Sequence, residues 1–130
     1  MSAPASAGAR VEAAIVATER LNPPLNAYLH LDPEGARAVA AEQDAIDAAR
    51  GVEAGPDPAR PLAGMPVCIK DIVDVAGMPT TAGGDGWLRR PDADATVVAR
   101  LRAAGAGVIG KGKTNEFACG RLRDRRSQPP

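Results

Sequence analysis

Aromatic side chains are scarce in this chain. Its 130 residues include one Trp, one Tyr and one Phe, against 27 alanines. Apolar residues still make up 45% of the chain, but each alanine buries little apolar area on folding. The core must therefore consist of small aliphatic groups, and we expect a single domain that is only marginally stable by itself.

Charge, apolar runs and cysteines exclude several classes of protein. The 16 basic residues balance the 16 acidic ones, which argues against binding nucleic acid or an anionic membrane through bulk charge. No apolar run approaches the ~18 residues of a membrane span. Cys68 and Cys119 form no CxxC pair, and with His30 they are too few for a four-ligand zinc site. We expect a reduced, cytoplasmic protein without metal or cofactor.

The first half of the sequence predicts two helices around a short strand. Apolar spacing favours a helix over residues 8–21, ended by Asn22-Pro23-Pro24. Residues 26–31 alternate in part and indicate a strand. Asp32 as N-cap and Pro33 as the first helical residue begin a second helix that reaches about Arg50. A loop over 51–60 follows.

The second half predicts strands, a long loop and a third helix. Residues 65–75 indicate one or two strands with Lys70 and Asp71 at their junction, and 77–92 has the glycine and proline content of a functional loop. Asp92 or Asp94 is expected to cap a helix that stops at Gly105, before a buried strand over 106–110. Val97, Val98, Leu101 and Ala104 are predicted to lie on one face of this helix.

Two phosphate-binding patterns match between residues 105 and 114. Residues 105–110 satisfy GxGxxG, and residues 107–114 satisfy GxxxxGK[ST]. A dinucleotide loop needs a strand before its first glycine, whereas a helix is predicted there, and a phosphate loop would place Val108 and Ile109 in solvent. We therefore favour a helix stop followed by a buried strand.

An inventory of side chains limits hydrolytic chemistry. The serines are Ser2, Ser6 and Ser127, all near the ends of the chain, so no Ser-His-Asp triad can be assembled. His30 is interpreted as a surface or packing residue, and Cys68, between Val67 and Ile69, as a small buried hydrophobe.

Lys70 is the candidate that remains. Among apolar side chains, desolvation lowers the pKa of a lysine, which can then accept a proton. From spacing alone, a strand-end lysine paired with Asp71 or Asp74 is the favoured interpretation.

Five sequence blocks, in order, resemble the N-terminal part of the amidase signature family over residues 10–120. They are Leu21-Asn-Pro-Pro-Leu-Asn-Ala-Tyr28, Pro61-Leu-Ala-Gly-Met-Pro-Val-Cys-Ile-Lys-Asp71, Val75-Ala-Gly-Met-Pro-Thr-Thr-Ala-Gly83, Asp94-Ala-Thr-Val-Val-Ala-Arg-Leu-Arg-Ala-Ala-Gly105, and Ile109-Gly-Lys111 with Glu116-Phe-Ala-Cys-Gly120. The resemblance implies an α/β fold with a mixed sheet flanked by helices. It also implies hydrolysis of a carboxamide by a Ser-cisSer-Lys triad in which Lys70 is the lysine. This reverses the interpretation of Lys70, which we then expect to be held uncharged among apolar side chains in a dry setting.

The end of the sequence departs from that family. Residues 1–120 are expected to be the N-terminal part of the amidase domain, and 121–130, RLRDRRSQPP, a disordered tail rich in Arg and Pro. The family's Gly/Ser-rich segment with both serines does not follow, so we expect a truncated enzyme that is inactive alone. Strands 65–75 and 106–110 are expected to need partner strands from beyond this sequence.

Other functions stay open at this point. The resemblance also covers the glutamine-hydrolysing chain of a tRNA amidotransferase, its A component, which would act with partner subunits. A non-catalytic nucleotide-binding or interaction fragment is the alternative from another class. Expected partners are a small-molecule amide substrate for an intact family member, and a second copy or a complementing chain.

Overall fold

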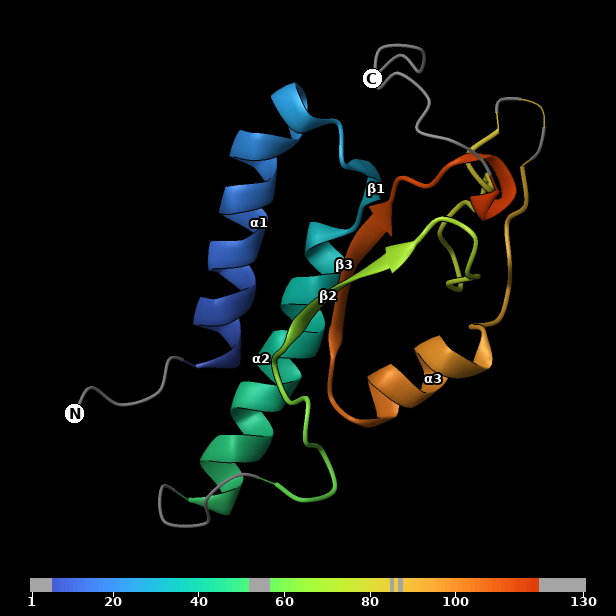
Figure 1. Ribbon diagram of the computed structural model, residues 1–130. Helices are drawn as coiled ribbons and strands as arrows, with labels where there is room; N and C mark the ends of the chain where they lie inside the picture. The colour runs from blue at the N-terminus through green and yellow to red at the C-terminus, as the bar shows by residue number, and fades with distance from the viewer. Residues whose placement is uncertain (1–5, 52–56, 85, 87, 120–130) are drawn as a thin grey trace.

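The computed structural model describes residues 6–51, 57–84, 86 and 88–119, which build a mixed sheet with helices on both faces (Figure 1). The strand order is β1-β3-β2, with β1 at Tyr28–Leu31, β2 at Pro66–Lys70 and β3 at Gly107–Gly112. Strand β3 pairs antiparallel with β1 and parallel with β2. The predicted α/β class with a mixed sheet is confirmed. The predicted tail, 121–130, and the domain end at 120 lie outside the described residues.

Helix α1, Ala7–Leu25, continues beyond its predicted end. Pro23 and Pro24 lie inside its last turn, where both are exposed, so the carbonyls that lose a backbone donor there can face water. The helix ends instead at Asn26, which is left-handed at φ 47° and whose N–H donates to the Asn22 carbonyl over 2.6 Å. No helix in the described ranges is long and apolar enough to cross a membrane.

Helix α2, Pro33–Arg50, begins as the sequence predicts. The Asp32 carboxylate accepts the Gly35 N–H at 2.9 Å, and Pro33 is the first helical residue, where its missing N–H has no intrahelical partner to lose. The Asp32 N–H donates to the Ile109 carbonyl at 3.0 Å. The start of α2 is thereby fixed to β3.

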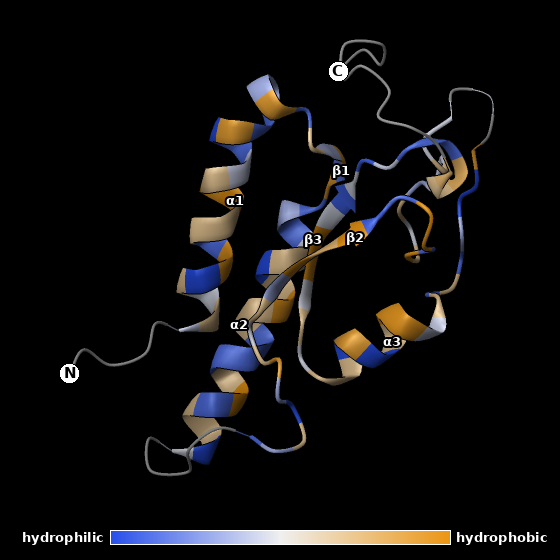
Figure 2. Cartoon of the chain, in the orientation of Figure 1, coloured by the Kyte–Doolittle hydropathy of each residue, from blue (hydrophilic) through white to orange (hydrophobic). Residues whose placement is uncertain are grey.

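Two small apolar clusters lie on opposite faces of β3. Val11, Ile15, Ala36 and Ala40 of α1 and α2 pack with Ile109. On the other face, Ile69, Val75, Met78 and Val98 pack with Val108. Figure 2 shows apolar and polar residues alternating along α1 and α2. Both clusters consist of small aliphatic side chains with one methionine, as the composition requires.

Helix α3, Thr96–Ala103, is confirmed, but two details of its prediction are wrong. Its N-cap is Ala95, because the Asp94 carboxylate instead accepts the Ala76 N–H at 2.8 Å and pairs with Arg102 at 2.9 Å. Val97 is 53% exposed, whereas Val98 is fully buried. The helix stops as predicted at Gly105, which has φ 94°.

The two strand segments expected to need outside partners pair with each other. The predicted strand over 65–75 ends at Lys70, where a turn carries the chain away from the sheet, and residues 66–70 lie parallel to residues 107–112. Within residues 77–92 the described backbone is loop apart from one bridge between Thr80 and Arg89. That loop returns to the end of β2, since the Ala82 N–H donates to the Asp71 carbonyl at 2.9 Å.

The close approach of β1 to β3 depends on a missing side chain. A Cβ at Gly110 would overlap the His30 carbonyl. We therefore expect Gly110→Ala to lower the free energy of unfolding by about 1–3 kcal/mol, as overpacking does. Urea denaturation followed by circular dichroism measures this. Gly86→Ala, where a Cβ meets nothing within 4 Å, is the matched control, and equal urea midpoints for the two variants would show that β1 does not pack as described.

Candidate functional site

Lys70 occupies the last position of β2, at the carboxyl end of an edge strand. Its carbonyl accepts two N–H groups, from Ile72 at 2.8 Å and from Val73 at 3.0 Å, which closes a tight turn. The backbone of Lys70 is therefore fixed on both sides, by the ladder before it and by the turn after it.

The prediction that Lys70 lies among apolar side chains is wrong. The residue is exposed. In the parallel pairing of β2 with β3, Lys70 lies beside Gly112, which has no side chain to cover it. On the other side of β2 the described residues provide no strand. The predicted pairing with Asp71 or Asp74 is not found either, because Asp71 pairs with Lys111 and Asp74 with Arg89. The Lys70 amine is thus open to approach by another group.

The buried lysine of this structure is Lys111. Lys111 has 0% and Asp71 1% of its surface exposed, and the two side chains form an ion pair with Nζ 3.2 Å from Oδ1. Lysine and aspartate are almost never fully buried unless they are paired. This pair was not predicted, since the buried strand was expected to end at residue 110; the apolar run that leads directly to Lys111 was the available signal.

Every donor of the Lys111 ammonium has an acceptor. Besides Asp71, Nζ donates to Thr80 Oγ1 at 2.7 Å and to the Pro79 carbonyl at 3.1 Å. The Asp71 carboxylate also accepts the Thr81 N–H at 3.1 Å and the Thr81 hydroxyl. Such full satisfaction is what permits two charges to remain in a dry interior.

A β-bulge aims Lys111 at this site. Val67 pairs with Val108 but Cys68 pairs with Gly110, so Ile109 is an extra residue in β3. Simple alternation would place Lys111 on the same face as Ile109, toward α1 and α2. After the bulge, Lys111 instead pairs with Ile69, on the face toward α3. A bulge leaves no pattern in the sequence that alternation could reveal.

The phosphate-binding patterns correspond to no phosphate loop. Residues 107–112 form β3, every residue of which is buried, and Val108 and Ile109 belong to the two apolar clusters. The backbone groups that would hold a phosphate are committed to the ladders with β1 and β2. The prediction of a helix stop followed by a buried strand is confirmed.

His30 and Cys68 lie on the strands that flank β3. His30 is half-buried on β1, as expected for a packing residue. The prediction of a buried Cys68 is wrong, since the residue is exposed on edge strand β2. Partial burial of its thiol still raises the pKa of Cys68, and this outweighs the lowering by the Tyr28 hydroxyl and by the charge of Lys111. Sγ lies against Gly112, where a Cβ would come within 2.7 Å.

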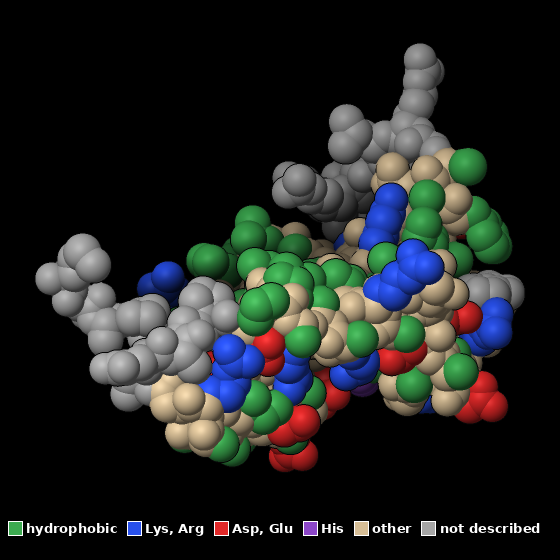
Figure 3. All heavy atoms as spheres, turned by 90° about the horizontal axis from the view of Figure 1, so that it is seen from below, with side chains coloured by type: hydrophobic (Ala, Val, Ile, Leu, Met, Phe, Trp, Pro, Cys, Tyr) green, Lys and Arg blue, Asp and Glu red, His purple; other side chains and the backbone are tan. Residues whose placement is uncertain are grey.

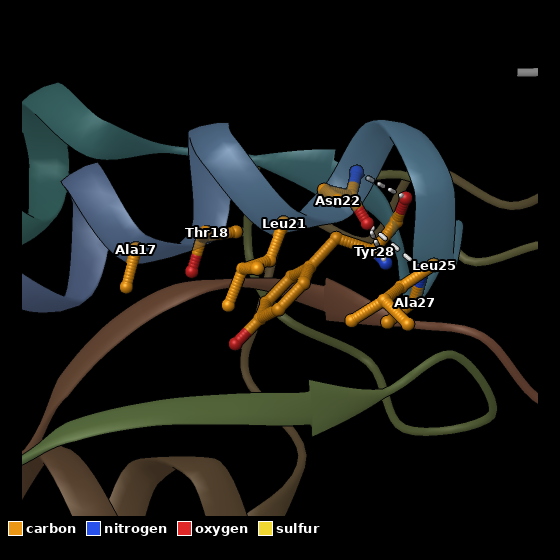
Figure 4. Close-up of a pocket in the computed structure, with 7 residues that line it drawn as sticks. All are labelled: Ala17, Thr18, Leu21, Asn22, Leu25, Ala27 and Tyr28. Carbon is orange, nitrogen blue, oxygen red and sulfur yellow. Dashed lines mark hydrogen bonds between the residues drawn. The ribbon is translucent and has the colours of Figure 1, made fainter.

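A pocket of about 170 Å³ lies between the end of α1 and β1 (Figure 4). Leu21, Leu25 and the Tyr28 ring form much of its wall, and Asn22 closes its end by accepting the Tyr28 N–H at 2.7 Å. Burial raises the pKa of Tyr28 to about 12, and the neighbouring Cys68 adds to the shift. The lining offers packing surface and no acid–base pair.

Comparison with known proteins extends over nearly the whole chain. Residues 9–124 match the family described as Amidase. The A component of glutamyl-tRNA(Gln) amidotransferase from Salinispora arenicola is 46% identical over 102 residues, covering 74% of this chain and 18% of that protein. Its counterpart from Nitratidesulfovibrio vulgaris is 42% identical over 115 residues, covering 86% of this chain and 22% of that protein.

Solved amidase structures share the fold described above. The structure of an amidase superimposes with a TM-score of 0.73 at 34% identity, over 89% of this chain and 25% of that one. The native peptide amidase from Stenotrophomonas maltophilia superimposes with a TM-score of 0.65 at 36% identity, over 87% of this chain and 22% of that one. The chain thus spans about a fifth of the length of the curated relatives it matches.

The environment of Tyr28 can be tested by pH titration, because the chain has one tyrosine. We expect its ultraviolet absorbance to change with a midpoint near pH 12 in the folded chain, against its ordinary pKa of 10.0 in urea. Since the folded-state pKa is the higher one, the associated stability is complete below pH 10 and is lost as the pH rises through about 12. Tyr28→Phe should abolish the signal. A folded-state midpoint at the urea value would contradict the packing of Tyr28.

The three lysines allow a direct test of burial. We expect trace acetylation followed by peptide mapping to modify Lys70 and Lys113 at least about tenfold faster than Lys111, because Lys111 reacts only when the structure opens. In urea the three rates should converge. Equal rates for Lys111 and Lys70 in the folded chain would rule out the buried pair.

Proposed function

Because this chain belongs to the amidase family, we propose that it supplies the acid–base lysine, Lys70, of a site that hydrolyses a carboxamide. The observation that supports this is the place of Lys70. It lies in the Pro61–Asp71 block that resembles the family's lysine motif, and its side chain extends from the carboxyl end of a strand, exposed to other groups. Its backbone is rigid while its amine is accessible, as a proton acceptor requires.

In this proposal the Lys70 amine takes a proton, through a bridging serine, from the serine that attacks the amide carbonyl. The attack forms an acyl-enzyme and releases the amine product, which receives the proton. Water then hydrolyses the acyl-enzyme. Lys70 can act in this way only while its amine is unprotonated, so we propose that protein packed over the end of β2 removes water from it.

The nucleophile in this proposal comes from outside the described residues. Their single serine, Ser6, caps α1 by accepting the Ala9 N–H at 3.1 Å. Large apolar side chains are exposed on the described part, including Leu88 at 59%, Phe117 at 58% and Val16 at 54%. Figure 3 shows apolar side chains gathered among Lys and Arg on the face seen from below. Such surfaces favour contact with further protein.

A second candidate is the A component of a tRNA amidotransferase. The Salinispora arenicola relative is 46% identical to this chain, whereas the peptide amidase is 36% identical. In this form the amide would be glutamine, and partner subunits would use the ammonia for transamidation on tRNA. Glutaminase activity that depends on partner subunits distinguishes this candidate from a free-standing amidase. For either candidate we propose a cytoplasmic location, which the free thiols of Cys68 and Cys119 support.

The role of Lys70 can be tested in a hybrid enzyme. Residues 1–119 replace the matching segment of the Stenotrophomonas maltophilia peptide amidase, and hydrolysis of a peptide amide is measured. We expect the hybrid to turn over and the 130-residue chain alone to be inactive. Lys70→Ala should lower kcat about a hundredfold or more, the range expected for losing an acid–base group. Lys70→Arg should do the same, because a guanidinium does not release its proton.

Lys113→Ala is the matched control, since it removes another lysine that lies outside the proposed relay. Circular dichroism of each variant verifies folding. A folded hybrid in which Lys70→Ala retains its kcat would refute the proposed function.

A further inference from the structure

We propose that the buried Asp71–Lys111 pair is a positioning device for Lys70, with Lys111 acting through Asp71 and never touching substrate. The proposal deepens the function proposed for Lys70 and rests on it. Lys111 lies on β3, whereas Lys70 ends β2. Lys111 is therefore linked to Lys70 through a tertiary contact, its ion pair with Asp71, the residue that directly follows Lys70.

Asp71 is held at every polar atom. Its N–H donates to the Gly112 carbonyl at 2.9 Å, and its carbonyl accepts the Ala82 N–H at 2.9 Å. Its carboxylate accepts from Lys111 and from both donors of Thr81. Because Asp71 cannot shift, the carbonyl of Lys70 keeps its orientation toward Ile72 and Val73. Only side-chain rotation then remains free to Lys70.

Lys111 also ties the following loop to the same point. Its ammonium binds Thr80 Oγ1 and the Pro79 carbonyl, while Thr81 binds Asp71. Next to this contact, Ala82 has a left-handed backbone at φ 53°, which a residue with a side chain adopts only when its surroundings impose it. The turn after Lys70 and the loop over residues 79–82 thus form one rigid unit centred on the ion pair.

Stability alone does not account for two buried charges at this place. An apolar pair of similar volume is often as stable as a buried ion pair, because burying each charge carries a desolvation penalty. Directional hydrogen bonds provide what apolar packing lacks, a fixed geometry. A proton acceptor needs a fixed geometry, because a misplacement of about 1 Å at a reacting group lowers the rate about a hundredfold. The pair is placed where such fixation matters, one residue from Lys70.

The test uses the full 130-residue chain and amide hydrogen exchange. The main variant is the neutral double substitution Asp71→Asn with Lys111→Met, which leaves no unpaired buried charge, whereas Lys111→Met alone leaves the Asp71 carboxylate buried without its cation. We expect protection of the Asp71 and Ala82 amides to fall by about a hundredfold, while the Asp32 and Leu62 amides, which bond elsewhere in the fold, change by less than about threefold. Lys113→Met is the control and should change neither set.

Two further readouts separate positioning from general stability. In the full chain, the backbone amide signals of Ile72 and Val73, whose N–H groups bond the Lys70 carbonyl, should move toward their unfolded positions in the double variant, while that of Asp32 stays. In the hybrid enzyme the double variant should lower kcat at least about tenfold with KM unchanged, the signature of an interaction used in the transition state.

Loss of protection that is uniform over the chain, or absent at Asp71 and Ala82, would overturn the positioning role. An unchanged kcat in the double variant, with Lys70→Ala inactive, would also overturn it and leave the proposed function standing. An active Lys70→Ala hybrid would instead refute the proposed function, whatever the exchange data show.

Discussion

The ion pair between Lys111 and Asp71 is the constraint on which the candidate site depends. It joins the central strand, the end of the edge strand and the loop after it, in a chain whose apolar clusters contain only small side chains and one methionine. Small side chains can pack densely, but each one contacts few other residues, so they hold segments that are distant in sequence together only weakly. Directional bonds from one ammonium to Asp71, Thr80 and Pro79 provide that lock.

Much of the fold was predictable because its signals are local. Asp32 and Pro33 predict the start of α2, and Gly105 predicts the end of α3. The apolar run after Gly105 predicts the central strand, β3. Errors arose where tertiary contacts decide. Helix α1 continues through Pro23 and Pro24 and ends at the left-handed C-cap Asn26. Asp94 does not cap α3, because its carboxylate binds the Ala76 N–H and Arg102 instead.

The site was predictable only in part. The predicted junction at Lys70 and Asp71 is the turn that ends β2, but the exposure of Lys70 depends on Gly112 beside it in the register, which no local pattern reveals. Lys111 was overlooked because the bulge at Ile109 reverses the face on which it lies. The lysine expected in a dry setting and the lysine found in one are therefore different residues, and the second holds the backbone next to the first.

The most direct measurement is the nitrogen-15 spectrum of the lysine ammonium groups in the full chain at neutral pH. If Lys111 is buried and bonded to Asp71, its ammonium protons exchange slowly enough with water to give a resolved signal, and that signal disappears in Asp71→Asn. A Lys111 ammonium that exchanges as fast as that of Lys70 would contradict the account, because the Asp71 carboxylate next to Lys70 would then lack its buried cation.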